Sequence, residues 1–541
     1  MQIGEITNFV KKNSDLIILG LVFVFSVLIL CQSHSNFIID DAFITFRYSH
    51  NLASGNGLVW NLDGAPTQGY TNFLFMLIVA IGIKLSVPPL IMAKGLNYFG
   101  LFLIAFSSFF ILRKATHSLL LRIILIITIS LYPTTIQNIN SGLETVFWTG
   151  LLLICLYLIN VQFSKLRYCL FIVLITAATL TRPETLLFAF IWFIILIFRK
   201  QNLKNIIIGI FTSSLAILSY WTFNLLYFGS ILPNSAFIKI VNPLSLPGIY
   251  YLTLSFQQNT PLSIVTILTI CFVFIFQKRN KSQYLSYLPF FIIIPFYVLT
   301  DPLMGMYSRF YYPVLMGMVV FAFSGMLNVI NSIRQINISQ EENKKTIRIL
   351  SFLKNIMIPI ILFCPVVILL LSGITAFIED LKQPYAQPLL DREIQIGNAL
   401  GRSPFVDNIY FAYGDAGSIP YYSGVKFLDM VGINDNRIAR SGKIEGAEWI
   451  LLYVMDEEPD VIGFYTTTDG KIYNSGHGII GTHYSELYSL MMENNNYIYI
   501  GGFECGWINI NFFARRNSQY FSDIAHLFGN MEGVRFFSIV P

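Results

Sequence analysis

The chain has 541 residues, of which 55% are hydrophobic and 12% are charged, and its mean hydropathy is +0.63. This composition excludes an ordinary soluble protein and is typical of one that crosses a membrane several times. The net charge of +5 does not indicate nucleic-acid binding, because the Lys and Arg residues lie between apolar runs, as in short cytoplasmic loops. The six cysteines form no disulfide or zinc-binding pattern.

The first apolar run, residues 16–31, follows Lys11 and Lys12. No small-residue cleavage pattern comes after it, so we interpret it as a retained first span rather than a signal peptide. The two lysines predict a cytoplasmic N-terminus, which places the residues after the span outside.

Asp40 and Asp41 follow this span and open a segment with helical spacing. Phe43 and Phe46 share one face of the predicted helix, and Gly55 lies where it should end. Charged residues beside a span are costly unless they face water or a partner. The pair therefore indicates a general base at the membrane surface, and the alternative is that Asp40 caps the helix.

The remaining apolar runs predict the transmembrane topology. They occupy residues 72–87, 89–112, 118–132, 145–163, 168–180, 185–198, 205–228, 260–277, 284–300, 312–330 and 354–375. Basic connections, which should be cytoplasmic, alternate with outer ones. The runs 72–87 and 89–112 lie between the outer segment after Asp41 and the first basic connection, at Arg113, which should be cytoplasmic. Because the chain must pass from the outside to the inside over this interval, the number of crossings in it must be odd. The short run 72–87 is therefore expected to lie in the outer interface, which leaves eleven spans and an external C-terminal region.

The runs 168–180 and 185–198 are also short for spans. Together they predict a hairpin whose tip, Thr181 to Glu184, stays below the outer surface. Charged groups at that depth are tolerated only inside protein or beside a cavity, so the tip is a candidate site.

The composition changes near residue 378, where Gly, Asp, Asn and Tyr become more frequent. We expect a transmembrane domain over residues 1–377 and a folded extracytoplasmic α/β domain over residues 378–541. Residues 408–413 and 449–453 have the pattern of short strands. Tyr421, Tyr422 and Trp449 are candidates for stacking on sugar rings, although Trp449 is as well suited to a core.

Polar side chains outside the basic loops gather on the outer side of this topology. They are Asp40, Asp41, Arg47, Gln68, Tyr70, Asn72, Glu144, Arg182, Glu184, Asn234, Lys239, Asp301 and Arg309. Convergence on one face favours a single polar site. Carboxylates with arginine and lysine suit a reaction that deprotonates a hydroxyl and releases a phosphate. Sugar transfer from a phosphate-linked donor is a reaction of this kind. Because nucleotides are not supplied outside the cytoplasm, the sugar donor would be carried on a polyprenyl phosphate.

Several phrases in chain order resemble a known family. They are Asp40 to Thr45, Gly69 to Leu74, Ser141 to Thr145, Thr181 to Glu184, Leu232 to Asn234 with Lys239, Arg309 and Phe310 with Pro313, Asp415 to Ser423, and Asp429 to Asp435. The acidic pair after the first span, the segment 72–87 and the cationic outer loops resemble the GT-C superfamily of integral-membrane glycosyltransferases. More narrowly, the chain resembles the mycobacterial terminal arabinofuranosyltransferase branch. The chain departs from that branch around Asp301 and at Thr185, which leaves the sugar open.

The resemblance implies a polytopic α-helical membrane protein of GT-C type, with about eleven spans plus juxtamembrane helices and a C-terminal α/β extracytoplasmic domain. It implies an inverting glycosyltransferase in the inner membrane, with a polyprenyl-phosphate sugar as donor and a glycan or glycolipid as acceptor. Asp40 is the first choice for the base, with Asp41 as its partner. The expected phosphate ligands are Arg182, Lys239 and Arg309, and the expected pocket residues are Gln68, Tyr70, Asn72, Glu144, Glu184, Asn234 and Asp301.

Other interpretations stay open at this stage. Arg182 and Lys239 could extend to lipid headgroups, and Glu144 could pair with an arginine. No metal site is predicted, although the charge of the two aspartates would suit a divalent cation. A transporter or flippase of lipid-linked sugars would also need cationic groups near a lipid phosphate. A non-enzymatic membrane protein that binds glycan would tolerate the loss of both aspartates.

Overall fold

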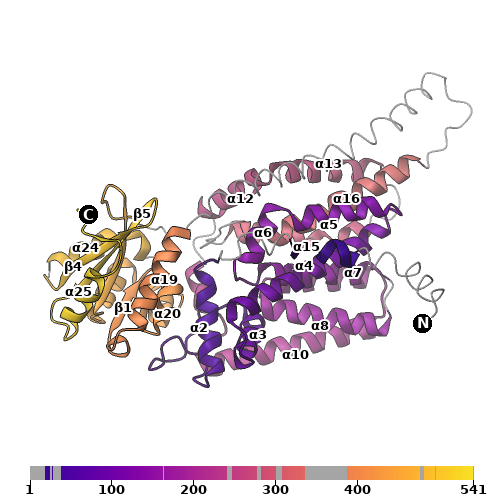
Figure 1. Cartoon of the computed structure of the whole chain (residues 1–541). Coiled ribbons are helices and arrows are strands. Elements are labelled where there is room, and N and C mark those ends of the chain that lie inside the picture. Colours follow the sequence, from indigo (N-terminus) through magenta and orange to yellow (C-terminus); the bar gives the residue numbers. More distant parts are fainter. Residues whose placement is uncertain are drawn as a thin grey trace, which may run out of the picture. The chain divides into compact units, whose positions relative to one another are not determined.

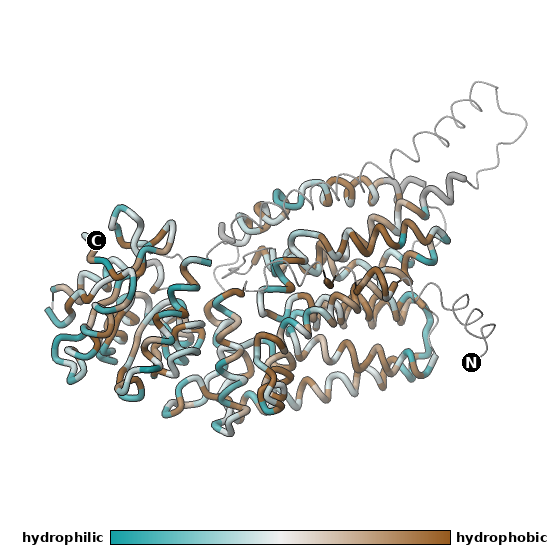
Figure 2. The backbone as a smooth tube through the Cα atoms, in the orientation of Figure 1, coloured by the Kyte–Doolittle hydropathy of each residue, from teal (hydrophilic) through white to brown (hydrophobic). Residues whose placement is uncertain are grey.

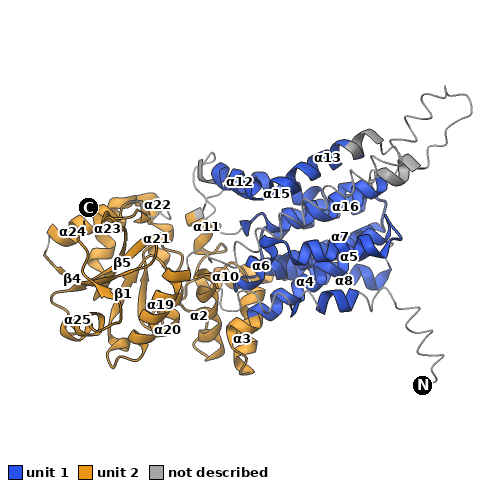
Figure 3. Ribbon diagram, turned by 45° about the horizontal axis from the view of Figure 1, so that its top comes forward, with its two compact units in different colours: residues 1–37, 93–217, 244–383 blue, residues 38–92, 218–243, 384–541 orange. Residues whose placement is uncertain are grey.

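The computed structural model describes residues 19–24, 27–28, 38–161, 164–239, 246–276, 282–299, 308–334, 387–474, 480–493 and 495–539. The chain forms two compact units (Figure 3). Unit 1 contains residues 1–37, 93–217 and 244–383, and unit 2 contains residues 38–92, 218–243 and 384–541. The expected domain boundary after residue 377 and the expected span 354–375 lie outside the described residues, as does half of the expected span 16–31.

Unit 1 is built from helices (Figure 1). They are α4 (Pro89–Arg113), α5 (Leu119–Ser130), α6 (Pro133–Asn140), α7 (Thr145–Asn160), α8 (Lys165–Thr181), α9 (Thr185–Phe198), α10 (Leu203–Phe228), α12 (Leu246–Gln258), α13 (Thr260–Phe276), α14 (Ser282–Leu285), α15 (Leu288–Val298) and α16 (Tyr312–Arg334). Helices α4 and α10 each extend into unit 2. Gly100 of α4 and Gly150 of α7 face each other so closely that a Cβ on either would overlap the backbone of the other helix. Small residues at such a crossing allow two apolar helices to pack tightly.

Hydrophobic residues predominate along these helices (Figure 2). Within the described residues, α4 and α10 are long and apolar enough to cross a membrane, and α5 with α6 forms a third candidate that is bent by 53°. The helices α7, α9 and α15 are shorter apolar elements. The expected number of about eleven spans therefore stays a prediction. Helices α8 and α9 meet at Arg182-Pro183-Glu184, as the hairpin prediction requires.

Unit 2 begins with α2 (Asp41–Ala53) and α3 (Phe73–Lys84), and α11 (Asn234–Lys239) also belongs to it. The helix predicted after Asp40 is confirmed, and it ends before Gly55 as expected. Helix α3 has 12 residues and rises about 18 Å, well short of an apolar layer of about 30 Å. Its length agrees with a segment that does not cross a membrane.

The C-terminal part of unit 2 contains a six-stranded mixed sheet in the order β2-β1-β3-β5-β4-β6. The strands are β1 (Tyr410–Tyr413), β2 (Lys426–Asp429), β3 (Val461–Thr467), β4 (Tyr497–Glu504), β5 (Ile508–Arg515) and β6 (Val534–Arg535). Strands β2, β1 and β3 are parallel neighbours, and the remaining pairings are antiparallel. The helices of this part are α19 (Gln387–Gly401), α20 (Ser418–Ser423), α21 (Asn436–Arg440), α22 (Gly442–Glu445), α23 (Ala447–Asp456), α24 (Tyr484–Glu493) and α25 (Phe521–Gly529), with 3-10 turns η3 (Val406–Asn408) and η4 (Ile480–Thr482).

The strand expected at residues 408–413 is confirmed over its last four residues as β1, but the strand expected at 449–453 is wrong. That segment belongs to helix α23, where Ile450 and Val454 lie one turn apart on the buried face. A short apolar run does not distinguish a strand from a buried helix. Trp449 stacks on Tyr453 within this helix, with ring centroids 5.3 Å apart.

One hydrophobic core connects α2 with the sheet. Ile44 and Tyr48 of α2 belong to the same buried cluster as Trp60, Phe411 and Phe427. Burial of such large aromatic side chains stabilises the contact between the N-terminal helix and a strand pair that follows it by more than 350 residues. The position of Asp40, one residue before α2, is therefore fixed by the C-terminal domain.

Candidate functional site: a carboxyl cluster and a buried arginine

Asp40 is held by the turn that opens α20. Its Oδ1 accepts a hydrogen bond of 2.6 Å from the amide of Ser418. Its side chain does not cap α2, so the capping alternative for Asp40 is wrong. Gly417 lies against the same carboxyl group, and a Cβ there would overlap both the backbone oxygen and the carboxylate of Asp40. The glycine is therefore needed for space and leaves Asp40 and Ser418 in direct contact.

Burial raises the pKa of Asp40 to about 7. The nearby carboxylate of Asp415 contributes to this rise, while the hydrogen bonds from Ser418 oppose it. Asp41 also raises this pKa, and it lies partly exposed in the first turn of α2. A carboxyl group poised near neutral pH can release and accept protons under ordinary conditions.

Glu393 completes the cluster and was missed by the sequence analysis. It is 1% exposed, and its two oxygens accept hydrogen bonds from Tyr413 at 3.1 Å and from the hydroxyl of Ser418 at 3.2 Å. Burial raises its pKa well above the usual value, and the charges of Asp40 and Asp415 raise it further. Ser418 thus binds Asp40 through its amide and Glu393 through its hydroxyl.

A signal for Glu393 was present in the sequence. Helix α19 buries Leu390, Glu393, Ile396 and Leu400, so a glutamate occupies a position of the apolar stripe. An ionisable residue on a buried face requires partners. The partners here come from β1 and α20, which follow in the sequence without any local pattern that links them to α19.

Asp415 is the third buried carboxyl group. Burial raises its pKa to about 6, and the nearby hydroxyl of Tyr465 opposes that effect. Three negative charges at close range repel one another at a cost in free energy. At least one of the carboxyl groups of Asp40, Glu393 and Asp415 therefore carries a proton. Within the described residues, no three acidic, histidine or cysteine side chains are arranged to hold a metal ion.

Arg47 fixes α2 to the C-terminal domain. Its guanidinium group donates to the carbonyl oxygens of Trp60 at 2.9 Å, Pro420 at 2.5 Å and Val425 at 2.9 Å. It also lies over the Trp60 ring, 4.5 Å from the centroid. Phe43 packs on Tyr421 and Tyr422 at centroid distances of 5.3 Å, so both tyrosines contact α2. These contacts hold Asp40 against Ser418.

The predicted pocket residues of unit 2 lie in a second polar network. The side-chain amide of Gln68 donates to the Tyr220 hydroxyl at 2.9 Å, and the backbone carbonyl of Gln68 accepts from the backbone amide of Asn234 at 2.9 Å. Asn72 donates to Thr45 at 3.2 Å. The structure also adds Asn434, whose side-chain oxygen lies against Gly69.

Four polar atoms of this network are buried and have no hydrogen-bond partner among the described residues. They are Gln68 Oε1, Tyr70 Oη, Asn234 Oδ1 and Asn434 Oδ1. Buried polar groups are normally satisfied by protein, water or a ligand. Three of these atoms are amide oxygens and one is a phenolic hydroxyl, so a hydroxyl-bearing molecule or water can satisfy them.

Unit 1 contains the other predicted group. The guanidinium group of Arg182 binds Glu144 at 2.6 Å and Glu184 at 3.4 Å, and all three side chains are largely buried. Arg182 and Arg309 both lie over the Phe310 ring, at 5.4 Å and 4.9 Å from its centroid. The alternative that Glu144 pairs with an arginine is therefore confirmed.

Two predicted residues remain to be placed. Lys239 is the last residue of α11. Asp301 lies outside the described residues. The described site residues thus form two groups, with Asp40, Asp41, Gln68, Tyr70, Asn72 and Asn234 in unit 2 and Glu144, Arg182, Glu184 and Arg309 in unit 1.

Comparison with known proteins identifies the fold. A family described as a domain of unknown function (DUF8728) matches residues 386–521, and no curated protein sequence matches the chain. Crystal structures of ArnT from Cupriavidus metallidurans are similar along nearly their whole length. The one bound to undecaprenyl phosphate has 9% identity and a TM-score of 0.53, and the similarity covers 92% of this chain and 97% of that one. The apo structure has 10% identity, a TM-score of 0.53 and coverages of 94% and 98%.

At these identities the similarity establishes the fold alone. The chain has the fold of these ArnT structures. The narrower resemblance to arabinofuranosyltransferases stays a prediction.

Proposed function

We propose that the protein is an inverting glycosyltransferase of the inner membrane. It transfers a sugar from a polyprenyl-phosphate donor to a glycan or glycolipid of the cell envelope. The observation that carries the proposal is the similarity to ArnT over almost both whole chains, because that relative was crystallised with undecaprenyl phosphate. The proposed orientation has a cytoplasmic N-terminus and a periplasmic C-terminal domain, so the reaction occurs at the outer face.

Asp40 is the proposed general base. In its ionised form it accepts the proton of an acceptor hydroxyl, and the oxygen then attacks the anomeric carbon of the donor sugar. The bond from that carbon to the phosphate oxygen breaks, and the polyprenyl phosphate leaves with the electron pair. A pKa of about 7 supports this role, because a base is most effective when its pKa lies near the working pH. Asp41 is its proposed partner in binding the acceptor.

The proposed ligands of the donor phosphate are Arg182, Arg309 and Lys239. Arginine presents a planar fork of donors that matches phosphate oxygens, and such groups stabilise the charge that develops on the leaving phosphate. Glu144 and Glu184 hold Arg182 in one orientation, which is the preorganisation that this role requires.

The sugar pocket is proposed to involve Gln68, Tyr70, Asn72, Asn234, Glu144, Glu184 and Asp301. Support comes from the buried, unpartnered atoms of Gln68, Tyr70 and Asn234, since sugar hydroxyls both donate and accept hydrogen bonds. Arabinofuranose or another pentose is the first candidate sugar, on the resemblance of the sequence alone.

The test is sugar transfer by the purified full-length protein in nanodiscs. Polyprenyl-phosphate pentoses and hexoses would be supplied one at a time, with cell-envelope glycan as the acceptor. We expect consumption of one donor class with release of polyprenyl phosphate and an inverted linkage in the product. If no donor is consumed by folded protein, while lipid-linked sugar crosses the bilayer of reconstituted vesicles, the protein is a transporter and the proposal is wrong.

A further inference from the structure

Glu393 is a buried ionisable residue to which the proposed mechanism gives no role. It is 1% exposed, and both of its oxygens accept hydrogen bonds, one from the Tyr413 hydroxyl at 3.1 Å and one from the Ser418 hydroxyl at 3.2 Å. Burying a carboxyl group costs free energy that an apolar residue on the same stripe of α19 would not cost. Packing of the core alone therefore does not account for a glutamate at this position.

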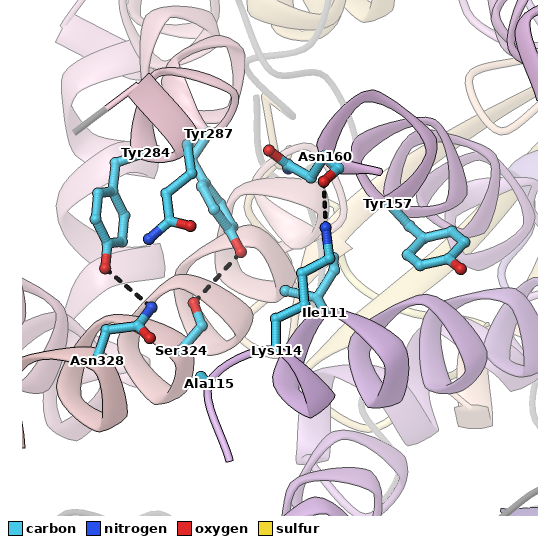
Figure 4. A pocket seen from close by; sticks show the side chains of 10 residues that line it. Ile111, Lys114, Ala115, Tyr157, Asn160, Tyr284, Tyr287, Ser324 and Asn328 are labelled. Carbon is cyan, nitrogen blue, oxygen red and sulfur yellow. Dashed lines mark hydrogen bonds between the residues drawn. The ribbon is translucent and has the colours of Figure 1, made fainter. Parts of the chain in front are cut away.

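Buried polar groups can serve packing alone, and unit 1 contains an example. A cavity of about 70 Å³ lies beside α16, and Figure 4 shows the side chains that line it. Asn328 donates to the Tyr284 hydroxyl at 3.1 Å, and the hydroxyls of Tyr287 and Ser324 lie 3.4 Å apart. These neutral groups connect α16 to the segment around α14, which is a structural role.

The hydrogen bonds of Glu393 lead instead to the proposed base. Ser418 donates its hydroxyl to Glu393 and its backbone amide to Asp40 Oδ1, the latter at 2.6 Å. Asp40 is partly exposed, whereas Glu393 is buried, so an acceptor hydroxyl can approach Asp40 but not Glu393. Glu393 therefore lies behind Ser418, on the side away from any substrate.

The sequence of α19 explains how Glu393 comes so close to α20. Glu393, Gly397 and Gly401 are spaced by four residues and lie along one face of the helix. A Cβ on Gly397 would lie 3.0 Å from a backbone oxygen of α20, and one on Gly401 would lie 2.8 Å from another. The two glycines allow α19 to pack closely on α20, which brings Glu393 to Ser418 at the start of that helix.

Tyr413 holds the other oxygen of Glu393 from the sheet. It is the last residue of β1, its side chain is fully buried, and its backbone oxygen accepts a hydrogen bond of 3.1 Å from the amide of Met430. Side chains that are packed in a core and bonded at both ends keep one rotamer. The contacts from Tyr413 through Glu393 to Ser418 therefore fix the turn that carries the Ser418 amide.

We propose that Glu393 is a positioning residue for sugar transfer. It binds the Ser418 hydroxyl and so keeps the Ser418 amide on Asp40 Oδ1, which fixes the orientation in which Asp40 receives the proton of the acceptor hydroxyl. The inference rests on the proposed function, in which Asp40 is the base. It adds a residue that acts on the reaction through Ser418 and touches no substrate.

A double-mutant cycle on sugar transfer by the purified full-length protein tests this role. Glu393→Gln keeps the size of the side chain and replaces one of the two accepting oxygens by a donor. A displacement of about 1 Å at a reacting group can cost up to about 10²-fold in rate, and we expect kcat to fall at least about tenfold. KM for the donor should stay within about twofold, because Glu393 does not bind the donor.

Ser418→Ala is the second arm of the cycle. It removes the hydroxyl that Glu393 binds and keeps the amide that binds Asp40, so kcat should fall by a similar factor. Adding Glu393→Gln to Ser418→Ala should cause no further loss, because Glu393 acts through that hydroxyl. Asp391→Asn is the matched control on the exposed face of α19, and its kcat should stay within about twofold of wild type.

Hydrogen exchange at the Ser418 amide tests the same contact without any sugar transfer. Glu393→Gln should increase the exchange rate of this amide about tenfold, and Asp391→Asn should leave it unchanged. A wild-type protein that transfers no sugar but shows this increase would count against the proposed function and not against the contact.

Three results would overturn the inference. The first is a pair of losses in kcat that multiply in the double variant, which would show that Glu393 does not act through Ser418. The second is an unchanged exchange rate in Glu393→Gln. The third is a loss of folded protein in Glu393→Gln with unchanged kcat per folded molecule, which would leave Glu393 a structural role alone. If Glu393→Gln does not fold, Ser418→Ala decides, and an unchanged kcat in that variant contradicts the inference.

Discussion

The two units bury their ionisable groups in opposite ways. In unit 2, Asp40, Glu393 and Asp415 are carboxyl groups held by hydroxyls and one amide, and burial raises the pKa of each. In unit 1, Arg182 is paired with Glu144 and Glu184. Buried carboxyl groups without a cationic partner tend to bind protons, whereas an ion pair keeps both partners charged and in one orientation. The first arrangement suits proton transfer, and the second suits electrostatic stabilisation.

The largest effect is expected from Asp40→Asn. Asparagine can still accept the Ser418 hydrogen bond through its side-chain oxygen, but it cannot take up a proton as a base. Turnover should fall by about 10²–10⁴-fold, the usual contribution of a general base, with little change in the unfolding midpoint. The measurement is the steady-state rate of transfer beside Asp407→Asn, which removes an exposed carboxylate of the same unit. Turnover within tenfold of wild type would remove Asp40 from the mechanism.

The second prediction concerns the ion pairs of unit 1. Arg182→Ala leaves two buried carboxylates without their partner, and the free energy of unfolding should fall by about 3–5 kcal/mol. Replacing Glu144 and Glu184 by glutamine in the same chain should recover most of that loss while transfer stays low. Denaturant unfolding of the detergent-solubilised protein measures the effect. If Arg182→Ala were as stable as the wild-type protein, the ion pairs of Arg182 would have no structural role.

A smaller effect is expected where unit 2 holds Asp40. In Gly417→Ala the new Cβ would overlap the backbone oxygen and carboxylate of Asp40, so the carboxyl group must move. A displacement of about 1 Å can reduce turnover by up to about 10²-fold, and we expect a loss of at least about tenfold. Gly529→Ala is the matched control, because its Cβ would meet no atom within 4 Å. Equal rates for the two variants would contradict a fixed position for Asp40.

The smallest effect is a shift in pH dependence. The rate should increase as pH rises through about 7, since Asp40 acts as a base only when ionised. Asp415→Asn removes a charge that raises the pKa of Asp40, so the midpoint of this rise should move to lower pH. Glu393→Gln should move the midpoint less, because the charges that raise the pKa of Asp40 are those of Asp415 and Asp41. A shift of equal size in both variants would show that the carboxyl groups titrate as one unit.

The carboxyl cluster also predicts how the stability of unit 2 depends on pH. The folded-state pKa values of Asp40 and Asp415 lie above those of unfolded aspartate, so the folded form binds more protons between about pH 4 and pH 7. The free energy of unfolding that this contributes is present in acid and is lost as pH rises through the folded values. Thermal unfolding across that range, with Asp40→Asn showing a flatter dependence, is the measurement.

Local patterns in the sequence were sufficient for the helical elements. The apolar runs predict most helices of unit 1, although α6 and α12 lie between the runs, and the spacing after Asp40 predicts α2, because each depends on neighbours within one or two turns. The same reasoning failed at residues 449–453, where five apolar residues fit a strand or a buried helix equally well. Packing of Ile450 and Val454 into the core decided between them.

The carboxyl cluster depended on contacts between distant segments. Asp40 and Ser418 are separated by 378 positions in the chain, and Glu393 reaches the same turn from a different helix. Nothing local relates these residues, so their shared proton-binding behaviour arises only when α2, α19 and α20 join one core. The sequence by itself determined the membrane class, the helices and the identity of the charged residues. The tertiary structure decided which charges are paired and which are buried together, because electrostatic free energy depends on distance and burial rather than on order along the chain.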